Sequence, residues 1–259
     1  MRLNLVVAHR REGEPIIKKW NLKPESGNIW RGEWLQLQIT GVGAVEAGIK
    51  TALLLSKYPY PLLNLGVAGS STFPVGSGIW VEKIVEKWSN TTFYPLPFDT
   101  PSAPLTTICS PGEYFPLTDM EGSGVFRGGI NFLTSHWIAF FKVVSDTSQT
   151  PFNPQIVPDL IGKNLEIVER IATFWGKEWR VLEEERRVLK EAEKLTFQFV
   201  SHYPNLTHSQ RFQLRELITF SLLLGTPLPS FPPPPLSKKE LQTLLTRWRR
   251  RMEDFFPLN

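Results

Sequence analysis

The amino-acid sequence predicts a layered α/β domain that is followed by an α-helical extension. Strand-like and helix-like apolar patterns alternate through roughly the first 150 residues, and charged amphipathic helical patterns replace them after Pro158. The chain has 259 residues, and single hydrophobic cores stop growing at about 250–300 residues, so one large core with an annex is expected. We place the α/β domain over residues 1–157 and the helical extension over residues 177–259.

The expected strands of the α/β domain are short apolar runs, or runs that alternate apolar and polar residues. In chain order they are Leu3–Ala8, Leu35–Ile39, Leu62–Val67, Ile79–Val85 and Phe140–Val144. A helix is expected over residues 44–56, because its apolar residues recur on one face after a glycine-containing turn. The ends of such strands are where α/β enzymes keep their sites, so candidate residues are sought there.

A proline-rich segment over residues 89–118 separates the last two of these strands. Its six prolines break regular structure, so we expect a long loop with one short strand at Leu105–Cys109. Loops of this length in compact domains are usually functional or disordered. In the extension we expect helices over 165–175 and 178–197, and two more that begin at the capping boxes Thr207–Gln210 and Ser237–Glu240. Pro232–Pro235 predicts an extended polyproline segment between those two boxes.

Composition excludes several classes of protein. Cys109 is the single cysteine, so the chain can form no intramolecular disulfide and no cysteine cluster for zinc or iron–sulfur. The histidines are scattered without metal-ligand spacing, and we expect no metal site. No apolar stretch approaches the roughly 18 residues of a membrane span, and the formal charge of +4 does not by itself indicate nucleic acid. We expect a cytoplasmic protein without a membrane partner.

Five short motifs at expected strand ends and turns contain a glycine or a carboxylate. In chain order they are Gly41-Val42-Gly43, Gly66-Val67-Ala68-Gly69, Val75-Gly76, Met120-Glu121 and Ser145-Asp146. Each alone is also typical of a generic turn or helix start, and none has the spacing of a dinucleotide fingerprint or P-loop. Their order resembles that of the nucleoside phosphorylase superfamily, nearest to its methylthioadenosine/S-adenosylhomocysteine nucleosidases and futalosine hydrolases.

The resemblance covers roughly the first 150 residues and a closing helix over residues 163–176. It implies a three-layer α/β/α fold around a central mixed sheet, and an enzyme that cleaves the N-glycosidic bond of a purine-type nucleoside. It also implies that no metal or organic cofactor takes part. The partners it implies are a small nucleoside substrate and further copies of the same chain, as a dimer or a larger homo-oligomer.

The resemblance assigns roles to the two carboxylate motifs. Glu121 is expected to accept hydrogen bonds from the ribose hydroxyls, with Met120 against the sugar, because a carboxylate is an acceptor that takes two hydroxyl donors. Asp146, beside Ser145, is expected to protonate or hydrogen-bond the imidazole nitrogen of the leaving purine, which is a form of general acid catalysis. A helix start for Glu121 and a simple turn for Asp146 are the structural alternatives.

Glu12 follows the first strand and resembles the glutamate that orients the attacking water in the hydrolases. Glu14 competes for this role, and the neighbours His9, Arg10 and Arg11 leave open a phosphate-binding site and a phosphorylase. Gly43, Ala68 and Gly69 lie in the turns where the backbone is expected to approach the ligand closely.

Two features depart from the family pattern. The interval between Val85 and Met120 is shorter than is usual, and we expect Phe115 or Tyr114 in it to stack on the base, unless the aromatic ring anchors the loop. The helix after Glu121 contains several glycines, each costing about 1 kcal/mol relative to alanine, so it is either tightly packed or irregular.

The extension contains no motif of the family, and its most conspicuous feature is a basic run around Trp248. Arginines occupy positions 247 and 249–251. Such a run is typical of a solvated helix face, and it is also found where a protein grips nucleic acid or an acidic partner. A third hypothesis is therefore a protein that has lost catalysis and binds a nucleoside or nucleic acid.

Overall fold

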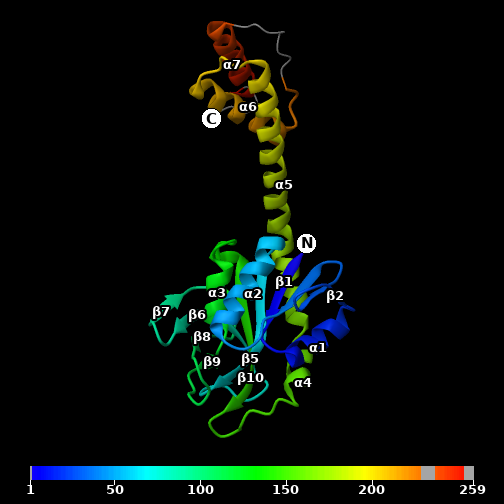
Figure 1. Cartoon of the computed structure of the whole chain (residues 1–259), viewed down its shortest axis with the longest axis vertical. Coiled ribbons are helices and arrows are strands. Elements are labelled where there is room, and N and C mark those ends of the chain that lie inside the picture. Colours follow the sequence, from blue (N-terminus) through cyan, green and yellow to red (C-terminus); the bar gives the residue numbers. More distant parts are fainter. Residues whose placement is uncertain (1, 229–236, 254–259) are drawn as a thin grey trace. The chain divides into compact units, whose positions relative to one another are not determined.

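The computed structural model describes residues 2–228 and 237–253, and the chain divides into two compact units, Met1–Lys177 and Glu178–Asn259 (Figure 1). The strands of the first unit are β1 Leu3–Val7, β2 Lys23–Pro24, β3 Ile29–Arg31, β4 Leu35–Ile39, β5 Leu62–Ser70, β6 Gly78–Glu86, β7 Thr91–Phe93, β8 Ser102–Thr107, β9 Leu117–Asp119 and β10 Ile138–Thr147. Its helices are α1 Arg10–Lys19, α2 Ala44–Lys57, α3 Gly122–Gly129, the short 3₁₀ turn Ser135–Trp137 and α4 Val157–Gly162. Helix α5, Glu166–His202, begins in the first unit and ends in the second.

All ten strands belong to one mixed sheet. Its order is β10-β6-β8-β9-β5-β1-β4-β3-β2, with β7 beside β6. Strand β10 also pairs in parallel with β5, so five strands, β5, β10, β6, β8 and β9, close on themselves while β1 to β4 extend the sheet from β5. Strands β1, β5 and β10 run parallel, which brings their carboxyl ends to the same edge of the sheet.

Helices cover the sheet in two layers, as predicted for an α/β/α fold. Helices α2 and α3 pack against each other to form one layer, and α1 and α4 pack against each other to form another (Figure 1). Every residue of β1 is buried, as expected for a strand covered on both faces. The predicted α/β fold with additional C-terminal helices is confirmed.

The glycines of α3 allow the backbones of α2 and α3 to approach closely. A Cβ atom at Gly124 would lie 1.8 Å from the carbonyl oxygen of Ala44, and one at Gly128 would lie 2.4 Å from that of Gly48. Of the two sequence-based alternatives, the tightly packed helix is therefore correct. This packing holds the first residue of α3 beside the turn that starts α2, and so fixes the position of Glu121.

Several predicted boundaries are wrong in an informative way. Strand β5 continues beyond Val67 to Ser70, and β10 continues beyond Val144 to Thr147. Ala68-Gly69 and Ser145-Asp146, which were expected to follow these strands, therefore lie within them. The short strand expected at 105–109 is β8, and it begins three residues earlier. The two helices expected over 165–175 and 178–197 form the single helix α5, since only Gly176 weakens helical propensity between them.

The second unit consists of the later part of α5, α6 His208–Leu224 and α7 Lys238–Glu253. Both predicted capping boxes are present, at Thr207 with Gln210 and at Ser237 with Glu240, whereas Pro232–Pro235 lies outside the described residues. Trp248 is buried in the apolar cluster of this unit, so its ring is not available to stack on a partner. None of the helices in the described residues combines the length and apolar character that crossing a bilayer requires.

Candidate active site

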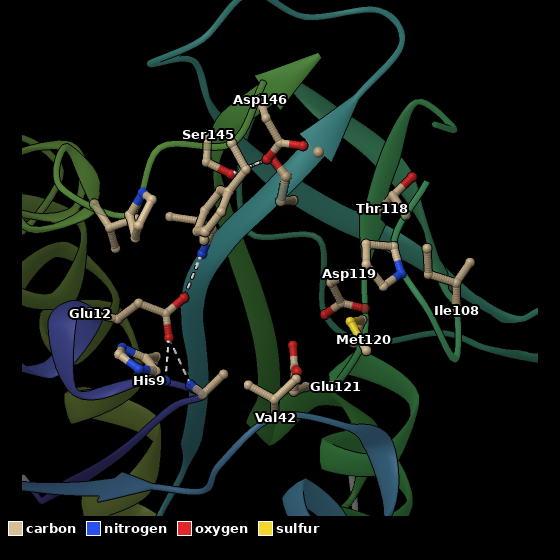
Figure 2. Close-up of a pocket in the computed structure, with 18 of the residues that line it drawn as sticks. His9, Glu12, Val42, Ile108, Thr118, Asp119, Met120, Glu121, Ser145 and Asp146 are labelled. Carbon is tan, nitrogen blue, oxygen red and sulfur yellow. Dashed lines mark hydrogen bonds between the residues drawn. The ribbon is translucent and has the colours of Figure 1, made fainter. Parts of the chain in front are cut away.

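A cavity of about 420 Å³ lies beside the ends of β1, β5, β9 and β10 (Figure 2). Seven of the nine site residues predicted from the sequence line it: Glu12, Ala68, Gly69, Met120, Glu121, Ser145 and Asp146. They come from four separate stretches of the chain, which the parallel arrangement of β1, β5 and β10 brings to one edge of the sheet. Figure 2 shows the carboxylates of Glu12, Glu121 and Asp146 around this one space.

Glu12 lies in the first turn of α1 and is held by three backbone N–H groups. Its Oε2 accepts hydrogen bonds from Ala8 and His9, each at 2.8 Å, and its Oε1 accepts one from Val67 at 2.8 Å. The contact with His9 belongs to a capping box, in which the third residue of the helix reaches back to the N-cap. Glu12, which follows the first strand as expected, is thus a helical residue, and it is only 3% exposed.

The glycine-rich stretch of β5 makes room for the protein's own side chains. A Cβ atom at Gly66 would lie 3.0 Å from Oε1 of Glu12. One at Gly69 would lie 3.1 Å from Oδ2 of Asp146 and 3.0 Å from the ring of Tyr114. These contacts are tighter than an ordinary van der Waals approach, so a larger residue at either position would displace a carboxylate of the site.

Glu121 is the N-cap residue of α3, and among the described residues it has one hydrogen-bond donor, the backbone N–H of Gly43 at 2.8 Å from its Oε1. Burial first, and then the charge of Asp119, raises the pKa of Glu121 to about 7, although the Gly43 N–H and the charge of Lys142 act in the opposite direction. This carboxyl therefore changes its protonation state near neutral pH.

Beneath the cavity, Lys142 of β10 forms a buried ion pair with Asp119 of β9, with its Nζ 2.9 Å from Oδ2. The Oγ1 of Thr107 and the N–H of Gly122 donate to the same carboxylate at 2.9 Å each. Burial lowers the pKa of Lys142, but the charge and hydrogen bond of Asp119 outweigh it and the pKa lies above its usual value. One buried cation thus stands among the carboxylates of Asp119, Glu121 and Glu12.

Asp146 lies near the end of β10, next to an irregularity in its pairing with β5. The pairing register shifts between Val144 and Asp146, so the residue between them is bypassed. Successive residues of a regular strand point to opposite faces, whereas a bulge re-aims a side chain, and here both Ser145 and Asp146 line the cavity. The Ser145 hydroxyl donates to Oδ1 of Asp146 at 2.5 Å, and the Tyr114 hydroxyl donates to Oδ2 at 3.0 Å.

Two predicted site residues, Phe115 and Gly43, do not line the cavity. The backbone N–H of Phe115 donates to Oγ1 of Thr118, and the ammonium group of Lys87 lies over its ring. Tyr114 is the aromatic residue of this loop that lines the cavity. Gly43 has a φ of +100°, a conformation that favours glycine, and directs its N–H to Glu121. Its role is to hold that carboxylate, while Val42 lines the cavity.

The Asp119–Lys142 pair was not predicted from the sequence, although the sequence contains one indication of it. Lys142 lies inside an apolar run that is predicted as a buried strand, and a buried lysine is almost always paired. Its partner is 23 positions upstream, on a strand of three residues with no recognisable pattern, so the pair itself was not predictable. Phe152, Pro154 and Val157, which line the apolar side of the cavity, carried no signal.

The cavity also has a cationic side. Arg11 lines it, and its Nη1 donates to the carbonyl oxygen of Pro154 at 2.8 Å. Arg10 pairs with Glu14 on the exposed side of α1, and neither residue lines the cavity. Within the described part of the chain, no three His, Cys, Asp or Glu side chains are grouped so as to hold a metal ion.

No family model and no curated protein matches the sequence. Its fold, in contrast, is similar to that of several solved structures. MTAN from Chlamydia trachomatis aligns at a TM-score of 0.55 and 20% identity, over 67% of this chain and 97% of that chain. The Arabidopsis thaliana 5′-methylthioadenosine nucleosidase aligns at 0.55 and 16%, over 67% and 95%, and a futalosine hydrolase from Helicobacter pylori at 0.52 and 12%, over 67% and 99%.

The chain has the nucleosidase fold. The alignments cover almost the whole of each solved structure but about two thirds of this chain. The aligned length is therefore close to the length of the first unit, Met1–Lys177. Within this fold the cavity described above is built from strand ends and the turns that follow them, which is where sheets with parallel strands place their ligands.

Proposed function

We propose that the protein hydrolyses the N-glycosidic bond of a purine-type nucleoside and releases the free base and a ribosyl product. The observation that carries the proposal is the cavity itself, in which Glu12, Glu121 and Asp146 stand in three different environments. Carboxyl groups whose surroundings differ in this way take different chemical roles in one reaction. The nucleosidase fold supports the same assignment.

Glu12 is suited to hold the attacking water. An ionised carboxylate offers about four acceptor positions, and three of them are used by backbone N–H groups. The fourth belongs to Oε1 and is available for one water molecule at the cavity. Because the carboxylate is fixed by donors on both oxygens, it directs that water without having to reorganise during the reaction.

Glu121 is suited to hold the ribose. One of its oxygens is bound to Gly43, and the carboxylate retains acceptor positions for the hydroxyl donors of a sugar. The transition state of glycosidic cleavage carries positive charge on the ribosyl group, so hydrogen bonds from its hydroxyls to an ionised carboxylate strengthen as the bond breaks. Met120, which also lines the cavity, would lie against the sugar.

Asp146 is suited to the base. It is partly exposed, lies opposite Glu121 in Figure 2, and is oriented by a hydroxyl donor on each of its oxygens. A purine that leaves as an anion needs a proton or a hydrogen bond at its imidazole nitrogen, and a positioned carboxyl supplies it with a rate gain of about 10²–10⁴.

Hydrolysis is favoured over phosphorolysis by the donors that Glu12 occupies. The N–H groups of Ala8, His9 and Val67 form a cluster of donors of the kind that binds an anion, and the carboxylate of Glu12 already fills it. A phosphate ion would lack these donors. Arg11 at the cavity is the observation that favours a phosphorylase, and it makes phosphate dependence a required arm of the test.

A panel of purine nucleosides, assayed for free base with and without phosphate, tests the proposal. We expect phosphate-independent release of base, lost in Glu12→Gln and retained in Glu14→Gln, whose exposed carboxylate pairs with Arg10 outside the cavity. Strict dependence on phosphate, with ribose 1-phosphate as product, would establish the phosphorylase instead. Binding of a nucleoside without turnover by the unchanged protein would establish a binding protein and contradict catalysis.

We further propose that the protein functions as a homo-oligomer in which a second copy covers α2. Val42, Val45, Ile49 and Leu53 recur at helical spacing, and each of them is more than half exposed. Val42 also lines the cavity, so a copy packed on this apolar stripe would lie at the cavity's edge. Sedimentation should show a dimer or larger assembly that dissociates in Ile49→Glu and persists in Val181→Glu, an exposed position of α5; a monomeric unchanged protein would contradict this.

A further inference from the structure

Arg11 brings a permanent positive charge to a cavity whose lining is otherwise acidic. It lies in the first turn of α1, immediately before Glu12, and is partly buried. The other charged or titratable groups of the lining, apart from the Tyr114 phenol, are one histidine and five carboxyl groups: His9, Glu12, Glu113, Asp119, Glu121 and Asp146. An anion that enters the cavity is therefore attracted toward Arg11 and repelled by the carboxylates, which gives it one favourable orientation.

The guanidinium of Arg11 is held in place but keeps most of its donors. Its Nη1 donates to the carbonyl oxygen of Pro154 at 2.8 Å, which joins α1 to the loop that follows β10. This contact is exposed to solvent, so Arg11 lies at the rim of the cavity. A guanidinium has five N–H donors in a planar fork, and the bond to Pro154 uses one of them.

No carboxylate among the described residues forms an ion pair with Arg11. Other cations hold the acids around it: Glu14, Glu113 and Asp119 pair with Arg10, Lys87 and Lys142, respectively. Glu12 follows Arg11 directly, but backbone N–H groups occupy its carboxylate. The charge of Arg11 is thus available to a ligand, and its planar fork matches the paired oxygens of a phosphate or a carboxylate.

His9 supplies a second donor next to Arg11. Its Nδ1 accepts the backbone N–H of Arg11 at 3.2 Å, as part of the capping box of α1. While Nδ1 accepts this bond, the ring proton is on Nε2, which makes that atom a hydrogen-bond donor. Because His9 also lines the cavity, the start of α1 offers a neutral and a charged donor to the same ligand.

The roles already proposed leave one part of the ribose without a partner. In the proposed function Glu12 holds the water at C1′, Asp146 meets the base and Glu121 accepts the 2′ and 3′ hydroxyls. The substituent that remains is the 5′ group on C4′. Arg11 is the cation of the cavity lining that has no part in those roles, and it is therefore the candidate to meet the 5′ group.

We propose that the nucleoside cleaved by this protein carries an anionic group at its 5′ carbon, and that Arg11 selects the substrate by binding that group. This deepens the proposed function and rests on it for the reaction. With a 5′-phosphate, the hydroxyl of water joins C1′ as the bond from C1′ to the base breaks. The proton that water loses balances the one that the base gains, and the products are the free base and ribose 5-phosphate.

Substrates that differ only in the 5′ group measure the role of Arg11. Adenosine, adenosine 5′-monophosphate and adenosine 5′-carboxylate share one base, and the same series with inosine covers a second purine. We expect kcat/KM of the unchanged protein to be about tenfold higher for an anionic substrate than for its neutral parent, because a charge-assisted hydrogen bond is gained. The arm that shows the preference identifies the anion as a phosphate or a carboxylate.

Arg11→Gln should remove this preference by raising KM for the anionic substrate about tenfold, while the neutral parent is cleaved as before. The backbone N–H that His9 accepts is retained in this variant. Arg10→Gln is the matched control and should keep the preference, because Arg10 pairs with Glu14 and does not line the cavity.

Three results of these assays would refute the proposal. If the bond to Pro154 serves only to tie the loop to α1, Arg11→Gln will lower kcat/KM for neutral and anionic substrates alike. Equal kcat/KM for both kinds of substrate in the unchanged protein would show that the 5′ anion is not recognised. A requirement for free phosphate that is lost in Arg11→Gln would assign Arg11 to the nucleophile instead.

Equilibrium binding separates this inference from the proposed function. If neutral and anionic nucleosides are cleaved equally well, nucleosidase activity stands and the inference fails. If no nucleoside is cleaved, the proposed function fails, and calorimetric titration with adenosine and adenosine 5′-monophosphate still tests Arg11. Tighter binding of the monophosphate by about tenfold, lost in Arg11→Gln and kept in Arg10→Gln, would support the selection of an anion. Equal affinities, or no binding of either compound, would refute it.

Discussion

The pKa of Glu121 predicts a pH-dependent loss of stability that the substitution Glu121→Gln should remove. The pKa rises from 4.5 to about 7, chiefly because the carboxyl is buried. A carboxyl with a raised pKa binds its proton more tightly in the folded state, so its favourable contribution is fully present below about pH 4.5 and is lost as the pH rises through about 7. At about 1.4 kcal/mol for each pKa unit, the loss at pH 8 is about 3 kcal/mol.

Glutamine at this position keeps an oxygen for the Gly43 N–H and cannot ionise. We therefore expect Glu121→Gln and the unchanged protein to have similar free energies of unfolding at pH 4.5, and the variant to be more stable by up to about 3 kcal/mol at pH 8. Urea unfolding followed by tryptophan fluorescence measures this, because seven of the nine tryptophans lie in the first unit. Glu14→Gln, at an exposed glutamate, should show no such trend. A difference that is equal at the two pH values, or that favours the unchanged protein at pH 8, would refute the reasoning.

Two further predictions concern buried contacts of the first unit, and the same urea experiment measures both. Lys142→Met leaves the carboxylate of Asp119 buried without its cation and should lower the free energy of unfolding by about 3–5 kcal/mol. Adding Asp119→Asn should recover part of this loss. Additive effects of the two substitutions would contradict the ion pair. Gly124→Ala should lower the free energy of unfolding by about 3 kcal/mol, because its Cβ atom would lie 1.8 Å from the Ala44 carbonyl oxygen. In Gly162→Ala of α4 the nearest atom to the new Cβ is 3.8 Å away, so this control should be neutral or stabilising by about 0.5–1 kcal/mol. Equal effects of the two glycine substitutions would show that α2 and α3 do not pack through Gly124.

The sequence was sufficient to predict the α/β fold because the apolar runs of β1, β5 and β10 have no polar face. It could not predict where β5 and β10 end. Glycine and Ser-Asp are usual in turns, but in β5 the glycines provide space for Glu12 and Asp146, and in β10 the pairing shift at Ser145 lets the strand continue. Tertiary packing decided these boundaries, and local propensity indicated the opposite.

The order of motifs along the chain predicted which residues meet, and it could not predict how they are held. Gly43 illustrates the limit, since it was expected to approach the ligand, whereas its N–H donates to Glu121 and the residue does not line the cavity. The choice between Phe115 and Tyr114 depended on the path of a shortened loop, which neighbouring residues alone do not determine. The Asp119–Lys142 pair depended on which strand of the closed sheet lies beside β10.

Burial raises the pKa of Glu121 to about 7, and few donors are present to offset it. Glu12 accepts three backbone N–H groups and Asp119 accepts a hydroxyl, an N–H and the ammonium of Lys142, while Glu121 accepts the single N–H of Gly43. A ribose would supply the missing donors, and hydrogen bonds to the ionised form favour that form. Nucleoside binding and loss of the Glu121 proton are then coupled. At pH 6, where the free protein holds this proton, binding should release close to one proton, and at pH 8 it should release almost none. Calorimetry in two buffers of different ionisation enthalpy measures the difference, and release that does not change with pH would show that Glu121 is not the group that meets the sugar.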